Sequence, residues 1–425
     1  MLDIKFIRQN PDLIKQAAQR KRIDADVDRL LAVDSRRVEL ITRTQELQEL
    51  RNRTNDQIKK AAAEEKGKLI AQMKEVSGQI KDLEAEMRGV QEEFDRLLLT
   101  MPMPPAPEVP DGKDDTENVE VRKWGEVPKF DFAPKDHVDL GAALDIIDIP
   151  RGAKLSGSRF YYLKGDGAML EWAVLQFTLN HMTKKGFVPM IVPVLAREHA
   201  MTGTAYFPGG EEQAYTVEKD ELFLVGTAEV SLTAYHYDEI LTEAELPKMY
   251  VALSPCFRRE AGAAGKDTRG LYRIHQFQKV EQVIVCRNDE DESRRMHEFI
   301  TRNSEEVVQA LGLPYRVVNV CTGDLGRGQV QKFDIECWMP SRGGYGETHS
   351  ASRFYDFQAR RLKLRYRDKD GKTQFCHTLN NTVIASPRIL IPLLENYQQA
   401  DGSVVIPEAL RPYMGGRERI VPRGA

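Results

Sequence analysis

Cysteine is scarce in this chain of 425 residues, which contains five cysteines and no C-x-x-C pair. A disulfide framework needs paired cysteines and a zinc site needs closely spaced ligands. An odd, widely spaced set in a chain of this size is typical of reduced thiols in a cytosol. We therefore expect no zinc and a reducing compartment. The five residues are Cys256, Cys286, Cys321, Cys337 and Cys376.

Long hydrophobic runs are also missing. No apolar stretch approaches the ~20 residues that a membrane-spanning helix needs, and the opening MLDIKFIRQNPDL is too polar for a signal peptide. The net charge of −4 excludes a uniformly basic nucleic-acid coat, although a local basic patch stays open. These observations predict a cytoplasmic protein with no membrane partner.

The familiar phosphate-binding motifs are absent. GKT at 371–373 lacks the upstream glycine of the phosphate loop, because Tyr366 occupies that position. GDLGRG at 323–328 lacks the third glycine of the dinucleotide fingerprint. The sequence also shows no Ser/His/Asp triad and no reactive Cys–His pattern. Any nucleotide chemistry here would therefore need a different site and no protein nucleophile.

Residues 69–97 have the clearest periodicity in the chain. Apolar residues recur there at alternating spacings of four and three, which is a heptad pattern. A weaker stripe with a period of seven precedes it at Val33, Leu40, Leu47 and Thr54. Gly67 is the expected break between the two segments. Two helices joined by a short turn run antiparallel, so we expect a two-helix coiled-coil arm, roughly 45–50 Å long at ~1.5 Å per residue.

The expected tip of this arm is mildly basic. Residues 51–68 contain six cations and three acids in a protein that is acidic as a whole. Such a tip suits a phosphate backbone, but a heptad hairpin is also typical of a dimerisation or spacer element. The cations are Arg51, Arg53, Lys59, Lys60, Lys66 and Lys68.

The character of the chain changes after a proline-rich segment. Five prolines between residues 102 and 110 end the helical pattern and predict a stiff linker. From about residue 120, short β-branched or aromatic runs alternate with turns, too densely for repeated strand–helix–strand units. We predict an α+β protein with two domains: the helical arm and its linker in 1–110, and a mostly antiparallel sheet flanked by helices in 111–425.

The stretch FRREAGAAGKDTRGLYRIHQFQKVE at 257–281 is typical of a hairpin with a polar, glycine-rich loop. Residues two apart in a strand share a face, so cations, an aromatic ring and carboxylates should line one side of it. That combination suits a nucleoside phosphate, whereas a solvated hairpin with cross-strand ion pairs is the simpler alternative. The residues on the return strand are Arg273, His275, Phe277, Lys279 and Glu281.

The same stretch resembles motif 2 of the class II aminoacyl-tRNA synthetases, in which FRRE is followed by R-x-x-x-F-x-x-x-E. GFVPMIVP at 186–193 resembles motif 1, and NNTVIASPR at 380–388 resembles motif 3. GTAE at 226–229, ETHS at 347–350 and residues 393–416 are similar to the seryl-tRNA synthetase family. In that family a heptad hairpin grips the tRNA. Motif 3 departs from many relatives, because Val383, Ile384 and Pro387 stand where glycine is common.

The resemblance implies an ATP site with Mg²⁺. Arg258 and Arg388 would be the catalytic residues, with Arg258 between the α-phosphate and the amino-acid carboxylate. Phe277 would stack on adenine, and Glu347 with Ser350 would hold Mg²⁺, since hard oxygen ligands suit that ion. The full set implied for ATP is Arg258, Arg259, Glu260, Ile274, Phe277, Glu347, Thr348, His349, Ser350 and Arg388.

The resemblance also implies a serine pocket and tRNA contacts. Which glutamate would bind the serine hydroxyl and which the ammonium stays open at this point. The pocket residues would be Thr227, Ala228, Glu229, Arg258, Glu281 and Thr382. The tRNA contacts would be Lys266 and Arg269 in the motif 2 loop and Arg51, Arg53, Lys59 and Lys60 on the arm.

The function implied is that of a homodimeric serine–tRNA ligase, which forms seryl-adenylate, AMP and pyrophosphate while charging tRNA(Ser). Whether tRNA(Sec) is charged as well stays open. One alternative is a synthetase-like ligase that loads an amino acid onto a carrier protein, which would have little use for the arm. Another is a non-catalytic RNA-binding coiled-coil paralogue, which would not need Arg258, Glu260, Glu347 and Arg388 together.

Overall fold

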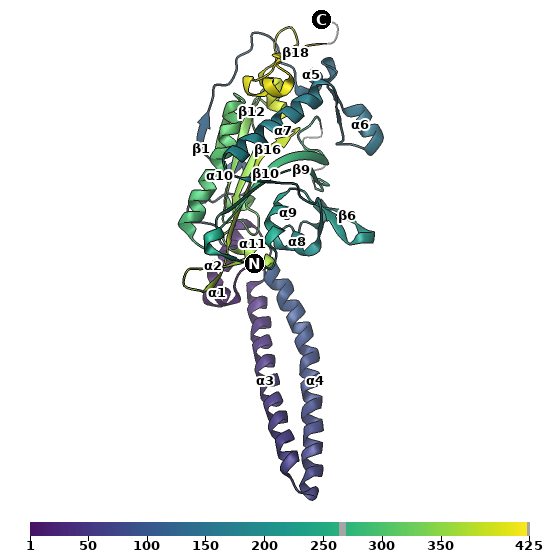
Figure 1. Ribbon diagram of the computed structural model, residues 1–425, viewed down its shortest axis with the longest axis vertical. Coiled ribbons are helices and arrows are strands. Elements are labelled where there is room, and N and C mark those ends of the chain that lie inside the picture. Colours follow the sequence, from purple (N-terminus) through teal and green to yellow (C-terminus); the bar gives the residue numbers. More distant parts are fainter. Residues whose placement is uncertain (263–268, 423–425) are drawn as a thin grey trace. The chain divides into compact units, whose positions relative to one another are not determined.

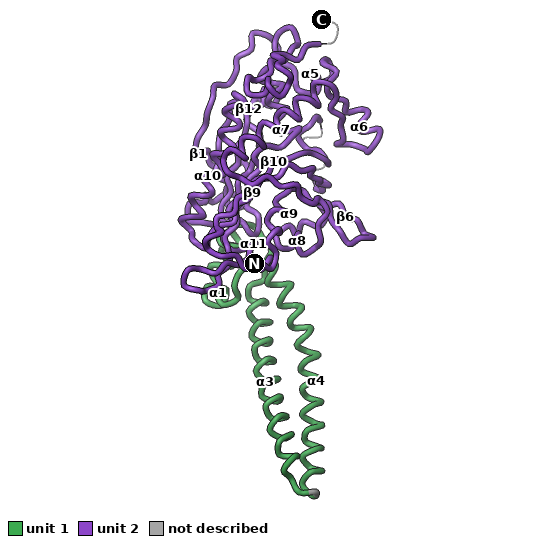
Figure 2. The backbone as a smooth tube through the Cα atoms, viewed as in Figure 1, with its two compact units in different colours: residues 1–104 green, residues 105–425 purple. Residues whose placement is uncertain are grey.

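The computed structural model describes residues 1–262 and 269–422. The chain divides into two compact units, Met1–Pro104 and Pro105–Ala425 (Figure 2). The division into functional domains at residue 110 stays a prediction.

Unit 1, Met1–Pro104, is built on two long antiparallel helices. Arg29 pairs with Glu93 and Arg36 with Glu86, which fixes the antiparallel register. The heptad residues of the first long helix are buried, as the period of seven predicts. The predicted coiled-coil pair is therefore confirmed. The helices are α1 (Ile4–Gln9), α2 (Pro11–Lys21), α3 (Val27–Lys60) and α4 (Ala63–Thr100) (Figure 1).

The turn between the long helices lies earlier than the sequence indicates. Ala61 and Ala62 have extended backbone, so Gly67 lies inside α4 and the prediction that it breaks the helix is wrong. One glycine costs a helix only ~1 kcal/mol relative to alanine. Lys59 and Lys60 are the last two residues of α3, and Glu64 and Glu65 lie in the first turn of α4. These charges complement the helix dipoles and favour ends at those positions.

Unit 2, Pro105–Ala425, is organised around an eight-stranded sheet. Every neighbouring pair in it is antiparallel except β4 with β9, which confirms the mostly antiparallel sheet. The order across the sheet is β1 (Val119–Trp124), β11 (Tyr315–Asn319), β12 (Gln331–Met339), β13 (Gly344–Arg353), β16 (His377–Ser386), β10 (Gln276–Cys286), β9 (Lys248–Phe257) and β4 (Val188–Met190).

One face of this sheet is covered by helices α7 (Asp166–Lys184) and α10 (Glu290–Ala310). The even-numbered residues of β10 point toward them: Val280 and Ile284 join the main core, and the Gln282 amide donates to the Ile300 carbonyl at 3.0 Å. Because side chains alternate along a strand, the odd-numbered residues of β10 are left for the opposite face. That face carries the site.

The remaining elements are short. The helices are α5 (His137–Ala143), α6 (Ile149–Ser156), α8 (Glu198–Gly203), α9 (Glu229–Thr233), α11 (Phe357–Leu362) and α12 (Leu390–Asn396). The strands are β2 (Ile147–Asp148), β3 (Tyr162–Leu163), β5 (Leu195–Arg197), β6 (Tyr215–Val217), β7 (Leu222–Leu224), β8 (Ile240–Thr242), β14 (Arg365–Arg367), β15 (Thr373–Phe375), β17 (Val404–Val405) and β18 (Arg419–Ile420). Within residues 1–262 and 269–422, no helix has the length and hydropathy needed to cross a membrane.

The second half of the proline-rich segment belongs to unit 2. The Ala106 N–H donates to the Val330 carbonyl at 2.8 Å, and Ala106 and Val109 pack in a small buried cluster of this unit. Glu108 forms an ion pair of 2.7 Å with the fully buried Arg353. Residues 106–109 are therefore held in place by backbone and side-chain contacts.

Candidate active site

A cavity of about 1000 Å³ opens where β9 and β10 begin to separate. A smaller one of about 70 Å³ adjoins it and shares five lining residues with it: Arg258, Glu260, Tyr272, Glu347 and Arg388. Phe277 lines the smaller cavity together with Arg258 and Arg388. Residues that are 130 positions apart in the sequence therefore meet in one place.

Most residues predicted for ATP line these two cavities. Arg259 is the exception: it lines neither of them, and its guanidinium lies 5.9 Å from the centre of the Tyr215 ring. Those that do are Arg258, Glu260, Ile274, Phe277, Glu347, Thr348, His349, Ser350 and Arg388.

The second strand of the hairpin, β10, begins later in the chain than the sequence indicates. β10 starts at Gln276, so Arg273 and His275 are not strand residues, and the prediction of one alternating face from residue 273 is wrong for these two. The reason is that residues 271–275 bond to other parts of unit 2. The His275 N–H donates to the Arg159 carbonyl, and its Nδ1 lies 2.9 Å from the Arg258 carbonyl.

Arg258 stands at the end of β9, where the hairpin opens into the cavity. Its backbone N–H donates to the His275 carbonyl at 3.0 Å, which fixes the position of the residue. Its Nε donates to the Gly226 carbonyl at 3.3 Å, and the guanidinium lies 5.3 Å from the centre of the Phe277 ring. The rest of the guanidinium therefore remains available to an anionic group.

Glu260 is carried into the cavity by a left-handed backbone conformation, with φ of 51°. Such a conformation is unfavourable for a non-glycine residue and has to be held by its surroundings. Its carboxylate accepts a hydrogen bond of 3.2 Å from the Arg273 guanidinium. The carboxylate is thus fixed near Ile274 and Phe277, which line the smaller cavity.

Arg388 follows β16 and is held by the return of the hairpin. Its Nε donates to the Tyr272 carbonyl and its Nη1 to the Glu347 carbonyl, both at 3.2 Å. Arg342 and Arg388 both lie against the Tyr272 ring, 4.0 and 4.4 Å from its centre. The Tyr272 hydroxyl donates to the Glu347 carbonyl at 3.3 Å. Tyr272 therefore connects the two arginines to the strand that carries Glu347.

A bulge in β13 brings Glu347 and Ser350 to the same face of the sheet. Residues three apart in a regular strand point to opposite faces. Here Glu347 pairs with Glu336 and His349 with Ile335, so Thr348 is the extra residue. Burial raises the pKa of Glu347, but Arg388, Lys332 and Arg258 lower it more, and the net pKa lies below its ordinary value.

Thr348 and His349 form the buried wall behind this carboxylate. The Thr348 hydroxyl donates to the Ile335 carbonyl at 3.1 Å, and Nδ1 of His349 lies 2.7 Å from the same hydroxyl. Burial lowers the pKa of His349 to about 3. The imidazole is therefore neutral at physiological pH.

A second bulge, at Val383 of β16, places Thr382 beside Glu281 on the face that carries the site. Lys279 lies between them: its Nζ is 2.7 Å from the Glu281 carboxylate and 2.9 Å from the Thr382 hydroxyl. The Thr382 hydroxyl donates to Glu281 at 3.0 Å. The charge of Glu281 is thus already balanced by a buried cation.

Glu229, the first residue of α9, has a different environment. Its carboxylate accepts hydrogen bonds from the Tyr206 hydroxyl at 3.0 Å and the Gln358 amide at 2.8 Å, both neutral groups. Burial, reinforced by the charge of Glu281, raises the pKa of Glu229 to about 7. Thr227 and Ala228 are buried beside it, and the Thr227 hydroxyl accepts the Glu229 N–H. A cationic group bound beside Glu229 would therefore stabilise the ionised form of its carboxylate.

Comparison with known proteins identifies the family. A model described as the seryl-tRNA synthetase N-terminal domain matches residues 1–105, and one described as the tRNA synthetase class II core domain (G, H, P, S and T) matches residues 215–397. A serine–tRNA ligase of Deinococcus radiodurans is 49% identical over 418 residues, which cover 98% of each chain. This chain belongs to the seryl-tRNA synthetase family.

Solved structures of this family agree. A seryl-tRNA synthetase from Pyrococcus horikoshii, complexed with ATP, superposes with a TM-score of 0.92 at 41% identity and covers 99% of this chain and all of the other. The cytoplasmic serine–tRNA ligase of Naegleria fowleri, in complex with AMP, has a TM-score of 0.88 at 32% identity, over 100% and 99% of the two chains. The predicted class II fold and seryl-tRNA synthetase family are confirmed.

Several of the cations predicted to touch tRNA are paired with acids of this chain. Arg269 is ion-paired with Asp136 at 3.0 Å and Asp139 at 2.7 Å, while Lys266 lies outside the described residues. On α3, Arg53 and Lys59 each pair with an acid on their own helix. The α3 set, Arg51, Arg53, Lys59 and Lys60, lies in the last three turns of the helix, and their contact with tRNA stays a prediction.

Sequence reasoning missed several residues that lie in or beside these cavities. Lys279 lies on the predicted hairpin face, but nothing in the sequence shows that it pairs with Glu281. Tyr206, Tyr272 and Gln358 reach the site from loops and a helix whose packing no local pattern indicates. Arg342 is likewise a single cation in a short turn. Each could have been found only from contacts between distant segments.

Proposed function

We propose that this chain, a serine–tRNA ligase, makes seryl-adenylate at the junction of the two cavities. A serine carboxylate oxygen attacks the α-phosphorus of ATP, and the bond to the leaving pyrophosphate breaks. A terminal ribose hydroxyl of tRNA then attacks the seryl carbonyl carbon and AMP leaves. The observation that carries this proposal is that Arg258, Phe277 and Arg388 line one cavity.

Arg258 would neutralise the charge that develops at the α-phosphorus. A fixed guanidinium in a site that excludes water stabilises a transition state more than the ground state. Phe277 offers a ring on which adenine can stack, and the fixed Glu260 carboxylate can accept from the adenine amino group. Arg388 would contact the phosphates on the side of Tyr272. No protein nucleophile is required, so catalysis consists of positioning and charge stabilisation.

Mg²⁺ fits the donors on the bulged strand. Glu347 supplies a carboxylate with a depressed pKa, and the bulge brings the Ser350 hydroxyl to the same side. Mg²⁺ usually takes one or two protein oxygens together with phosphate oxygens and waters. When bound, the ion would neutralise phosphate charge. Glu347 would also keep Arg388 in place through their contact of 3.6 Å.

The two buried glutamates would divide the recognition of serine. Glu281, balanced by Lys279 and next to Thr382, suits the neutral side-chain hydroxyl. Glu229, whose hydrogen-bond partners are neutral, suits the ammonium group. A site with such paired groups rejects alanine, because a missing hydroxyl leaves buried polar atoms without partners.

The pH dependence of serine binding should follow Glu229. Its pKa of about 7 means that the neutral form dominates at lower pH, and the ammonium group requires the ionised form. We expect the KM for serine to fall about tenfold as the pH rises from 6 to 8. Exchange kinetics at several pH values would measure this. Glu229→Gln should have a higher KM that no longer varies with pH over this range. If the KM of that variant still falls with rising pH as it does in the wild type, the assignment is excluded.

The partners and the location follow the family as proposals. We infer a homodimer, because β4 is an edge strand next to the fully exposed Ile191 and Val188 is 54% exposed. A molar mass near 48.4 kDa in light scattering would refute it. The five cysteines are buried free thiols, which suits a reducing cytoplasm. The acylated partner would be tRNA(Ser).

The experiment that tests the function is ATP–pyrophosphate exchange with each amino acid in turn, with and without tRNA. Among the amino acids, we expect only L-serine to support exchange. The exchange should not need tRNA and should be lost when Mg²⁺ is chelated. Charging of tRNA(Ser) should require both ATP and L-serine. Exchange with another amino acid and none with serine would refute the serine specificity. Transfer to a carrier protein in place of tRNA would favour the alternative ligase.

A further inference from the structure

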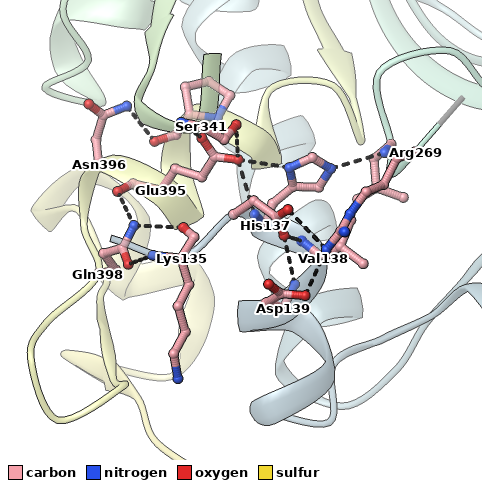
Figure 3. A network of polar contacts seen from close by, with 12 residues as sticks. Lys135, His137, Val138, Asp139, Arg269, Ser341, Glu395, Asn396 and Gln398 are labelled. Atoms are coloured by element: carbon pink, nitrogen blue, oxygen red, sulfur yellow. Dashed lines mark hydrogen bonds and ion pairs between the residues drawn. The ribbon is translucent and has the colours of Figure 1, made fainter. Parts of the chain in front are cut away.

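A buried network links α5 to the return of the motif 2 hairpin and to α12, the helix that follows motif 3 (Figure 3). His137 of α5 lies between two partners. Its Nδ1 is 2.8 Å from the Glu395 carboxylate, and its Nε2 is 3.1 Å from the backbone nitrogen of Leu271. None of these residues was predicted as part of the site.

The partners of His137 fix its tautomer. A backbone N–H can only donate, so Nε2 must accept the Leu271 N–H and Nδ1 must carry the proton that it gives to Glu395. Glu395 is fully buried and also accepts the backbone N–H of His137 at 3.0 Å. The Ser341 hydroxyl and N–H donate to the same carboxylate at 2.8 and 2.9 Å. Four hydrogen bonds therefore hold the acid that orients the ring.

The hairpin returns against this ring at a glycine. Gly270 has φ of +83°, and a Cβ there would lie 2.1 Å from Nε2 of His137. Leu271, which follows Gly270, donates its N–H to His137, and Tyr272 comes directly after Leu271. On the other side of the network, Ser341 precedes Arg342, which lies against the Tyr272 ring. The network thus fixes Tyr272 from two directions.

We propose that His137 and Glu395 form a clamp that positions Tyr272, and through it Arg388 and Glu347, for ATP. This inference rests on the proposed function of the cavity. The Tyr272 carbonyl accepts from Arg388, and its hydroxyl donates to the Glu347 carbonyl. The serine pocket is held separately, by Lys279, Tyr206 and Gln358. His137 and Glu395 are positioning residues, because neither lines the cavities.

Two substitutions of His137 distinguish its contact with Glu395 from its contact with Leu271. His137→Asn keeps a donor near Glu395 but cannot reach Leu271, whereas His137→Gln has an amide oxygen long enough to accept the Leu271 N–H. In serine-dependent exchange we expect His137→Asn to raise the KM for ATP about tenfold, because a buried backbone N–H loses its partner. The KM for serine should stay within about twofold. His137→Gln should recover most of the ATP affinity.

A matched pair of glycine variants tests the same clamp from the hairpin side. Gly270→Ala and Gly371→Ala both place a side chain at a φ near +80°, but only the first meets His137, since nothing lies within 4 Å at Gly371. We expect Gly270→Ala to raise the KM for ATP and Gly371→Ala to leave it unchanged. Thermal melting would show that each variant is folded.

Two results would overturn the clamp. One is an unchanged KM for ATP in folded His137→Asn and Gly270→Ala. The other is an equal rise in the KM for ATP and for serine, which would indicate a general loosening of unit 2. Failure of the proposed function is distinct from both, because the wild-type protein itself would then show no serine-dependent exchange.

Discussion

Arg258→Lys is expected to lower the rate of serine-dependent ATP–pyrophosphate exchange by about 10²- to 10³-fold. Lysine keeps the charge but loses the planar fork that can bridge two anionic groups. In this protein one edge of the guanidinium is bound to the Gly226 carbonyl. The remaining N–H groups would join the α-phosphate to the serine carboxylate, and an ammonium cannot make both contacts from the same anchor.

The control for this variant is Arg302→Lys on α10. Arg302 is an exposed residue paired with Glu298 on the same helix, and its replacement should leave exchange unchanged. Pre-steady-state measurement of adenylate formation would separate chemistry from product release. A loss confined to the KM for ATP, with kcat intact, would mean that Arg258 only binds nucleotide and does not stabilise the transition state.

Shortening the arm should separate the two half-reactions. Replacing residues 41–82 by a short helix–helix turn removes the outer part of α3 and α4. It retains the Arg36–Glu86 and Arg29–Glu93 pairs and the apolar cluster that contains Leu30 and Phe94. We expect exchange to stay within about twofold and tRNA charging to fall at least ~100-fold, because the proposed contacts of the arm with tRNA phosphates would be lost. Exchange and charging assays on the same preparation would measure both.

A milder variant tests which residues of the arm matter. Replacing Arg51, Arg53, Lys59 and Lys60 by glutamine leaves the buried seam of α3 intact, because Leu47 and Thr54 carry that seam here. The KM for tRNA should rise, and charging should depend less steeply on salt, since fewer counterions are released on binding. Normal charging by the shortened protein would show that the arm does not grip tRNA.

Patterns that are local in the sequence predicted much of the fold. The period of seven at Val33, Leu40 and Leu47 predicted the buried seam of α3, because such spacing returns a side chain to the same side of a helix. Alternation in the return strand placed Phe277, Lys279 and Glu281 on one face. The predicted position of the turn between α3 and α4, at Gly67, was wrong. The charges at the helix ends favour a turn at residues 61 and 62, and one glycine inside α4 costs little.

The site itself was predicted by resemblance to motifs and only partly by the chemistry of single residues. The sequence placed Glu229 and Glu281 together in a serine pocket but could not separate their roles. Their environments differ, because Lys279 balances Glu281 while the neutral Tyr206 and Gln358 surround Glu229, and our proposed division of roles rests on this difference. Arg259 follows Arg258 in the sequence, yet its guanidinium lies near Tyr215, because the chain has left β9 and the Arg259 N–H donates to the Gln213 carbonyl, two residues before Tyr215.

Sequence patterns were sufficient for the helical arm, the antiparallel class of the sheet, the family and most of the residues that line the smaller cavity, because periodicity and motif spacing are properties of neighbouring residues. Tertiary structure alone decided the bulges that bring Glu347 beside Ser350 and Thr382 beside Glu281. It also decided the raised pKa of Glu229 and the clamp of His137 on Leu271. These depend on segments up to 258 residues apart meeting in one core, as His137 and Glu395 do, and burial and charge act there through space.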